Sequence, residues 1–109
     1  MGLDIYAYAV EAGATLKHGK RLQSWRKHYA LWDWCEKLAR ERGSWVEDYT
    51  VQAFELTRAD IDQLLTAVAD GDLSDRWLRI DWRPHDLLFI AKAMFAFGAG
   101  RTVIISADW

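Results

Sequence analysis

The chain opens with Leu3-Asp4-Ile5-Tyr6-Ala7-Tyr8-Ala9-Val10, a run rich in β-branched and aromatic residues that predicts a strand. Polar residues stand at alternating places in this run and in a second predicted strand near the other end of the chain, Thr102 to Ser106. Strands of a parallel α/β sheet are covered on both faces and read as continuous apolar runs. The alternation therefore favours an α+β fold, with helices on one face of a small sheet.

A long helix is predicted from Gln23 to Arg42. Ser24 can cap its start, and Gly43 can end it in the left-handed conformation. The apolar residues of this segment cover well over half of the helix circumference, whereas a surface helix needs an apolar arc of a little over about 100°. The excess is centred on Trp34, so this side is either covered by a loop or offered to a partner.

Two further helices are predicted in the second half of the chain. Thr57 caps a helix from Arg58 to Asp70, in which Asp60 takes the third position of a capping box. A third helix runs from Pro84 to Phe97 and is apolar almost all round, with Lys92 as its main polar interruption. Such a helix lies deep in a fold or in an interface.

The remaining segments complete the predicted architecture. Tyr49 to Leu56 and Arg76 to Trp82 have extended patterns, and Glu11 to Lys20 is predicted as a loop. We therefore predict a single domain over residues 1–109, with a small sheet of three to four strands and three helices packed mainly on one face.

The composition agrees with one soluble domain. The chain has 109 residues, of which 51% are hydrophobic and 28% charged, and this balance excludes intrinsic disorder. No apolar run reaches the roughly 18 residues that a membrane span needs. No basic segment typical of a secretory signal follows Met1, and the single Cys35 cannot form an internal disulfide. We expect a cytoplasmic protein that does not enter a membrane.

Charge is divided unevenly along the chain, although the net charge is only −2. Residues 1–32 carry five Lys or Arg against two carboxylates, and residues 44–75 carry eight carboxylates against one Arg. The acidic segment predicts a contact for a basic partner at Asp60 and Asp62. The basic segment predicts an anion-binding site formed by Lys17, Lys20, Arg21 and Arg26. The alternative to both predictions is that the two segments are solvated faces without a partner.

Residues that catalyse reactions or bind metals do not occur at usable spacing. Cys35 and the three histidines show no CxxC, HxxxH or HExxH pattern. His28 and Cys35 share a helix face but would lie about 10.5 Å apart along the axis, too far for a nucleophile and its base. The glycines of Gly98-Ala99-Gly100 follow a predicted helix, the reverse of the order in phosphate-binding loops. We predict no catalytic residue, no metal site, no cofactor and no enzymatic activity.

Three stretches of the chain together resemble a family of small uncharacterised bacteriophage and prophage proteins. Members of that family look like MGLDxY at the start, WRKxxxLxxW in the middle and YxSSW at the end. Many members carry an aromatic, glycine-rich insert where this chain has the shorter and more charged segment Leu73 to Trp82. The matching stretches here are Met1-Gly2-Leu3-Asp4-Ile5-Tyr6, Trp25-Arg26-Lys27 with Trp34, and Ser106-Ala107-Asp108-Trp109. The resemblance implies a phage-linked protein in a bacterial cytoplasm, and it carries over no active site.

These observations lead to one main hypothesis and several rivals. The main hypothesis is a protein that binds a host macromolecule, for example as an inhibitor of a defence system such as CRISPR, with Trp34, Trp45 and Trp109 as aromatic contacts. A nucleic-acid-binding accessory protein would use the basic segment beside Trp25 and Tyr29, but both aromatic residues fall on the core face of the predicted helix. A small-molecule enzyme and a structural homodimer without catalytic activity complete the rival hypotheses.

Overall fold

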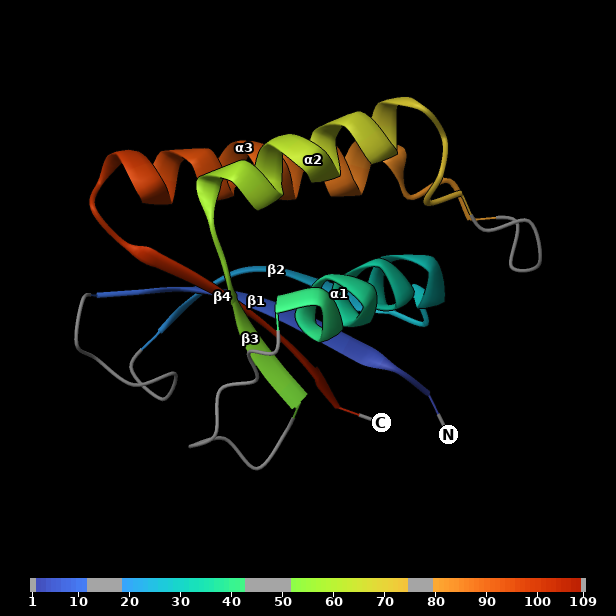
Figure 1. Ribbon diagram of the computed structural model, residues 1–109, viewed down its shortest axis with the longest axis horizontal. Helices are drawn as coiled ribbons and strands as arrows, with labels where there is room; N and C mark the ends of the chain where they lie inside the picture. Colours follow the sequence, from blue (N-terminus) through green and yellow to red (C-terminus); the bar gives the residue numbers. More distant parts are fainter. Residues whose placement is uncertain (1, 12–18, 43–51, 75–79, 109) are drawn as a thin grey trace.

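A computed structural model describes residues 2–11, 19–42, 52–74 and 80–108. In these parts of the chain, four strands form one antiparallel sheet in the order β2-β1-β4-β3, accompanied by three helices (Figure 1). The fold is α+β, as predicted. In chain order the elements are β1 (Asp4–Val10), β2 (Lys20–Arg26), α1 (Tyr29–Arg42), β3 (Gln52–Leu56), α2 (Arg58–Ala69), α3 (Arg83–Gly98) and β4 (Thr102–Asp108).

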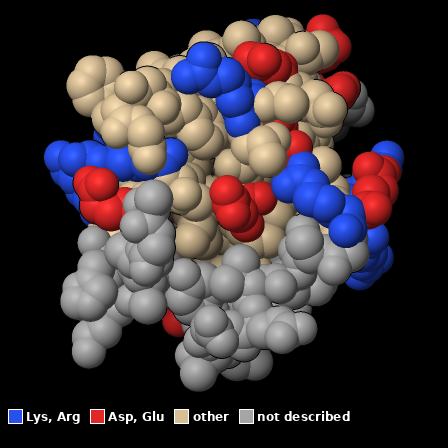
Figure 2. All heavy atoms as spheres, turned by 60° about the vertical axis from the view of Figure 1, so that its left-hand side comes forward, with Lys and Arg blue, Asp and Glu red and all other residues tan. Residues whose placement is uncertain are grey.

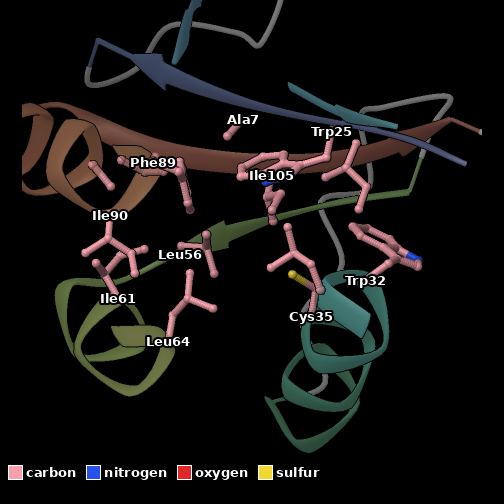
Figure 3. Packing of buried hydrophobic residues seen from close by; sticks show 14 of the residues in the cluster. Ala7, Trp25, Trp32, Cys35, Leu56, Ile61, Leu64, Phe89, Ile90 and Ile105 are labelled. Carbon is pink, nitrogen blue, oxygen red and sulfur yellow. The ribbon is translucent and has the colours of Figure 1, made fainter. Parts of the chain in front are cut away.

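The helices pack on one face of the sheet. Ile5 and Ala7 of β1 and Ile105 of β4 are fully buried and belong to one core cluster, which also contains side chains from α1, α2 and α3. Figure 3 shows α1 and α2 on the same side of the strands, with the labelled side chains filling the space between. Alternate residues of β1 enter this cluster because successive side chains of a strand point to opposite faces.

The largest departure from the predicted elements is at β2. The predicted long helix begins inside this segment, but the segment is a strand that pairs antiparallel with β1. Trp25 lies opposite Ile5 and is buried, so its apolar position suits a strand as well as a helix. Ser24 pairs within the sheet instead of capping a helix. Lys27 adopts φ 61°, and its N–H donates to the oxygen of Leu3 at 2.6 Å. This left-handed residue separates the strand from α1.

The other helices and the last strand are confirmed. Thr57 is the N-cap of α2 and forms both hydrogen bonds of a capping box with Asp60. α3 has Pro84 in its first turn, and β4 extends two residues beyond the predicted end, to Asp108. None of the helices in the described parts of the chain is long and apolar enough to cross a membrane.

Three predicted segments lie partly outside the described residues. Of the predicted loop over residues 11–20, residues 12–18 are outside, and Lys20 belongs to β2. Of the predicted strand over residues 49–56, the described part is β3. Of the predicted strand over residues 76–82, Ile80 forms an isolated bridge and Trp82 is the N-cap of α3, so the described part is not a strand. Trp82 precedes the helix directly, because α3 begins at Arg83 with Pro84 in its first turn.

Candidate functional site

One side of α3 is apolar and exposed. Phe95 has 80% of its surface exposed and Leu88 has 50%, whereas Phe89 and Ala93 on the inner side of the same helix are fully buried. The helix therefore does not lie deep in the fold, and its outer side is both apolar and exposed. The exposed, uncharged residues are here named the α3 face: Pro84, Leu87, Leu88, Ala91, Phe95 and Gly98.

A groove of about 480 Å³ lies beside the α3 face, between β2 and α3. This volume is in the range of ligand-binding sites, about 300–1,000 Å³. Figure 2 shows the side of the molecule where α3 runs into β4, with uncharged atoms gathered at the upper left and a band of Lys and Arg atoms below them. The charged residues of this β2–α3 groove are all basic. Its lining consists of Lys20, Arg21, Leu22, Ala91, Lys92, Phe95, Ala96 and Arg101.

Two of the groove cations are held by internal partners. Lys92 Nζ donates a hydrogen bond to the main-chain oxygen of Leu22 at 3.0 Å. Arg101 Nε lies 3.0 Å from a carboxylate oxygen of Glu11. These contacts join α3 to the edge strand β2 and the start of β4 to the end of β1. The carboxylate of Glu11 offsets the charge of Arg101, whereas the neutral carbonyl of Leu22 leaves the charge of Lys92 in place.

The other two groove cations keep their charge available. The guanidinium of Arg21 lies 4.6 Å from the centre of the Tyr6 ring, a cation–π contact. Tyr6 alternates with the core-facing Ile5 and Ala7 of β1, so this guanidinium lies on the sheet face turned away from the helices. In the described residues, neither Lys20 nor Arg21 forms an ion pair with a carboxylate. Both side chains are exposed. Lys20 pairs with Ala9, on the sheet face that the helices cover, so Lys20 is the better placed of the two for an anionic ligand in the groove.

The predicted anion-binding residues are only partly brought together. Lys20 and Arg21 line the groove, but Arg26 lies at the opposite end of β2 and is exposed outside it. Lys17 lies outside the described residues. The basic site is therefore not the continuous segment that the sequence predicts. Lys92 and Arg101, distant in sequence, take the remaining positions.

Of the three tryptophans predicted as partner contacts, the structure describes Trp34. Trp34 is half-buried and packs against the core cluster, so the wide apolar arc of α1 is covered in part by the protein itself. Trp45 and Trp109 lie outside the described residues. In the described chain, the large apolar side chain with the greatest exposure is Phe95, for which the sequence predicts no contact.

The two predicted acidic contacts have different surroundings. Asp60 is only 3% exposed, and its carboxylate accepts hydrogen bonds from the main-chain N–H of Thr57 and from Arg42. Burial raises the pKa of Asp60, but the bonds from Arg42 and Thr57 outweigh this effect and hold the pKa below its usual value. Asp60 is thus a structural residue and not the surface contact that the sequence predicts, whereas Asp62 is exposed.

We expect the contacts of Asp60 to make the protein less stable in acid. Because the pKa of Asp60 is lower in the folded than in the unfolded state, the stabilisation is present above about pH 4 and is lost as pH falls through the folded pKa. Asp60→Ala should lower the free energy of unfolding at neutral pH by about 1–3 kcal/mol. It should also make stability less dependent on pH in acid.

Urea unfolding of Asp60→Ala at neutral pH and at about pH 3 measures both effects. Asp62→Ala is the matched control, because Asp62 is an exposed carboxylate on the same helix. Equal loss of stability in acid for the wild type and Asp60→Ala would contradict the assignment.

A buried polar cluster joins the start of α3 to β2 and α1. Asp86 is 2% exposed, accepts a hydrogen bond from Trp25 Nε1 at 2.8 Å and lies 3.0 Å from His28 Nε2. Because a carboxylate only accepts hydrogen bonds, His28 Nε2 is the donor. The Trp82 ring stacks on the His28 ring with centroids 4.8 Å apart. The cluster ties together residues about 60 positions apart in the chain.

The geometry of this cluster suits structure better than chemistry. His28 with Asp86 has the arrangement of a general base with its orienting carboxylate, but His28 is fully buried. Its Nδ1 has no hydrogen-bond partner among the described residues. A cavity beside Asp86 and Trp82 measures about 20 Å³, which is room for about one water molecule. A substrate has no access to the imidazole in this arrangement.

In the described parts of the chain, neither Cys35 nor the residue types that bind metals form a catalytic or metal site. Burial raises the pKa of the Cys35 thiol well above its usual value, with nearby carboxylates acting in the same direction. A buried neutral thiol is a poor nucleophile. Among the residues that the structure describes, no group of three His, Cys, Asp or Glu side chains could hold a metal ion.

Lys92 is the one residue of the groove outside β2 that has a local signal in the sequence. It interrupts an otherwise apolar helix, and a cation in such a place must reach water or a polar group. In the structure it reaches the main chain of β2. Arg101 and Phe95 carry no comparable local signal, because their positions relative to β2 depend on how α3 packs.

Comparison with known proteins adds no family to these observations. No protein-family model matches the chain, and no curated protein or solved structure matches it significantly.

Proposed function

We propose that this protein acts by binding another macromolecule through the α3 face and the β2–α3 groove. The observation that carries this proposal is the exposure of Phe95, 80%, on an uncharged helix face. Exposed apolar patches of this kind mark binding sites, and large aromatic residues are preferred anchors in interfaces.

The lining of the groove supports binding rather than acid–base chemistry. Its polar groups are ammonium and guanidinium groups only, without a carboxyl, imidazole, hydroxyl or thiol side chain among the described lining residues. Lys and Arg with an adjacent apolar surface can recognise a ligand with anionic and apolar parts. This combination favours a binding protein over a small-molecule enzyme.

We further propose that the bound macromolecule belongs to a bacterial host. The support is the resemblance of the chain to small phage and prophage proteins, together with the exposed α3 face. Inhibition of a host defence system, such as CRISPR, is a role that a small binding protein can perform by covering a functional surface. The proposal places the protein in the bacterial cytoplasm.

Affinity capture from a bacterial lysate tests the role of the α3 face. We expect the wild type to retain a defined host component and Phe95→Ala to retain at least about tenfold less of it, as for an interface hot spot. Leu65→Ala is the control, because Leu65 is a 43% exposed apolar residue on α2, outside the α3 face.

Two results would contradict the proposed function. One is equal capture by the wild type and Phe95→Ala. The other is a wild type that forms a dimer at micromolar concentration in light scattering while Phe95→Ala is monomeric, since the face would then serve self-association.

A further inference from the structure

We propose that the partner segment seated in the β2–α3 groove is an acidic amphipathic helix of a protein. Its apolar side would lie on Leu88, Ala91 and Phe95, and its carboxylates would face Lys20 and Lys92. This inference rests on the proposed function and names the chemistry of the partner at the same surface.

The charge of the groove selects an acidic ligand. All four charged residues of its lining are basic, and Lys20 and Arg21 form no ion pair with a carboxylate in the described part of the chain. Complementary charges at the margin of an interface orient the partner and accelerate association.

The edge of β2 is poorly suited to receive an added strand. Lys92 Nζ already donates to the oxygen of Leu22 at 3.0 Å, and His85 Nε2 donates to the oxygen of Ser24 at 2.6 Å. The pairing of β2 with β1 is also irregular between Ala7 and Tyr8. Strand addition depends on free main-chain groups along a regular edge. A partner strand would have to displace the two side chains of α3.

The α3 face has the dimensions of a helix-binding surface. Leu87 and Phe95 are eight residues apart, which is about 12 Å along the helix axis and a little over two turns. A helix that binds such a surface uses apolar anchors at spacings of three, four and seven residues. The groove runs beside this face and adds Leu22 and Ala96 to the apolar contact.

Single-stranded nucleic acid fits the same surface less well. Proteins that bind single strands stack successive bases on several aromatic side chains along a basic track. The α3 face offers one aromatic ring, Phe95, beside the aliphatic Leu87 and Leu88. Two of the four groove cations, Lys92 and Arg101, already have internal partners. The exposed aliphatic surface favours a protein segment.

Fluorescence anisotropy with three labelled probes tests the inference. The first probe is a helix-forming peptide of about 18 residues with Leu at helical spacing and Glu on the flanks. The second has Lys in place of every Glu, and the third is an oligo-dT single strand. We expect the wild type to bind the Glu peptide at least about tenfold more tightly than the Lys peptide.

Charge-reversal variants locate the binding. Lys20→Glu should weaken binding of the Glu peptide at least about tenfold and reduce the preference for it over the Lys peptide. Arg26→Glu is the matched control on the same strand, since Arg26 is exposed but lies outside the groove, and it should change the affinity less than about twofold. Phe95→Ala should weaken binding of the Glu peptide without changing the preference between the two peptides.

The outcomes separate this inference from the proposed function. Equal binding of the two peptides, or binding of oligo-dT alone, overturns the inference but leaves binding through the groove intact. If no probe binds but lysate capture depends on Phe95, the inference is again overturned and the proposed function stands. Absence of probe binding with capture that does not depend on Phe95 overturns both.

Discussion

Asp86→Ala should lower the free energy of unfolding by about 2–6 kcal/mol, because it leaves two buried hydrogen-bond donors without an acceptor, at about 1–3 kcal/mol each. Asp86 is 2% exposed and is the common acceptor for Trp25 Nε1 and His28 Nε2. Without the Asp86 carboxylate, both donors lose their hydrogen bonds and remain buried, where water has little access to replace the lost acceptor. The loss is a large part of the roughly 5–15 kcal/mol that stabilises a domain of this kind.

The cluster holds three elements together, which is why the expected effect is large. Trp25 lies on β2, His28 immediately precedes α1, and Asp86 lies in the first turn of α3. A carboxylate in the first turn also interacts favourably with the helix dipole. Removal of this one side chain therefore weakens the attachment of α3 to both other elements.

Urea unfolding followed by tryptophan fluorescence measures the change. Asp86→Asn preserves the shape and one acceptor oxygen, and it should lose less, about 1–3 kcal/mol. If Asp86→Ala does not fold, Asp86→Asn still gives a measurable value. Asp62→Ala, at an exposed carboxylate, should change stability by less than about 0.5 kcal/mol. A loss below about 1 kcal/mol for Asp86→Ala would show that the cluster does not stabilise the fold.

Phe89→Ala and Phe95→Ala should differ by several kcal/mol although both lie on α3. Phe89 is fully buried and packs edge to face on Trp25, with ring centroids 5.0 Å apart. Its removal leaves a cavity in the core and should lower the free energy of unfolding by about 3–5 kcal/mol. Phe95 is 80% exposed, and alanine has the higher helix propensity, so Phe95→Ala should change stability by less than about 0.5 kcal/mol.

This pair of variants also separates stability from function. Thermal unfolding of Phe89→Ala, Phe95→Ala and the wild type measures the difference on one helix. If Phe95→Ala is as stable as the wild type, a loss of partner capture by this variant is due to the α3 face and not to unfolding. A marked destabilisation by Phe95→Ala would mean that Phe95 is packed and that the α3 face is not a free surface.

Several elements follow from local sequence alone. The capping box of Thr57 and Asp60 involves residues three positions apart, so the start of α2 can be predicted without knowledge of the rest of the chain. The alternation in β1 reports a sheet with one face toward the helices, because side chains of a strand point to opposite faces in turn. In β4 the residues from Val103 to Ala107 are all buried, so its burial does not alternate. Both signals are complete within a few residues.

The beginning of the predicted long helix was wrong for a different reason. Trp25 is followed by apolar residues at helical spacing, and this local pattern favours a helix. The hydrogen bonds that decide the conformation of β2 come from β1, more than ten residues earlier in the chain. A strand on the edge of a sheet gains most of its order from its neighbour, so its own residues specify it weakly.

Local patterns were sufficient to predict the fold class, the capped helix α2 and the apolar character of α3. The packing of distant segments was needed to establish that Asp60 is buried against Arg42 and that Phe95 is exposed. It also places Lys20 and Arg21 in one groove with cations about 70–80 residues further along the chain. The features predicted from sequence differ from those that needed the structure, because helix caps and strand alternation depend on neighbours along the chain. Burial and surface charge depend on which elements pack together, and contacts between distant residues decide that.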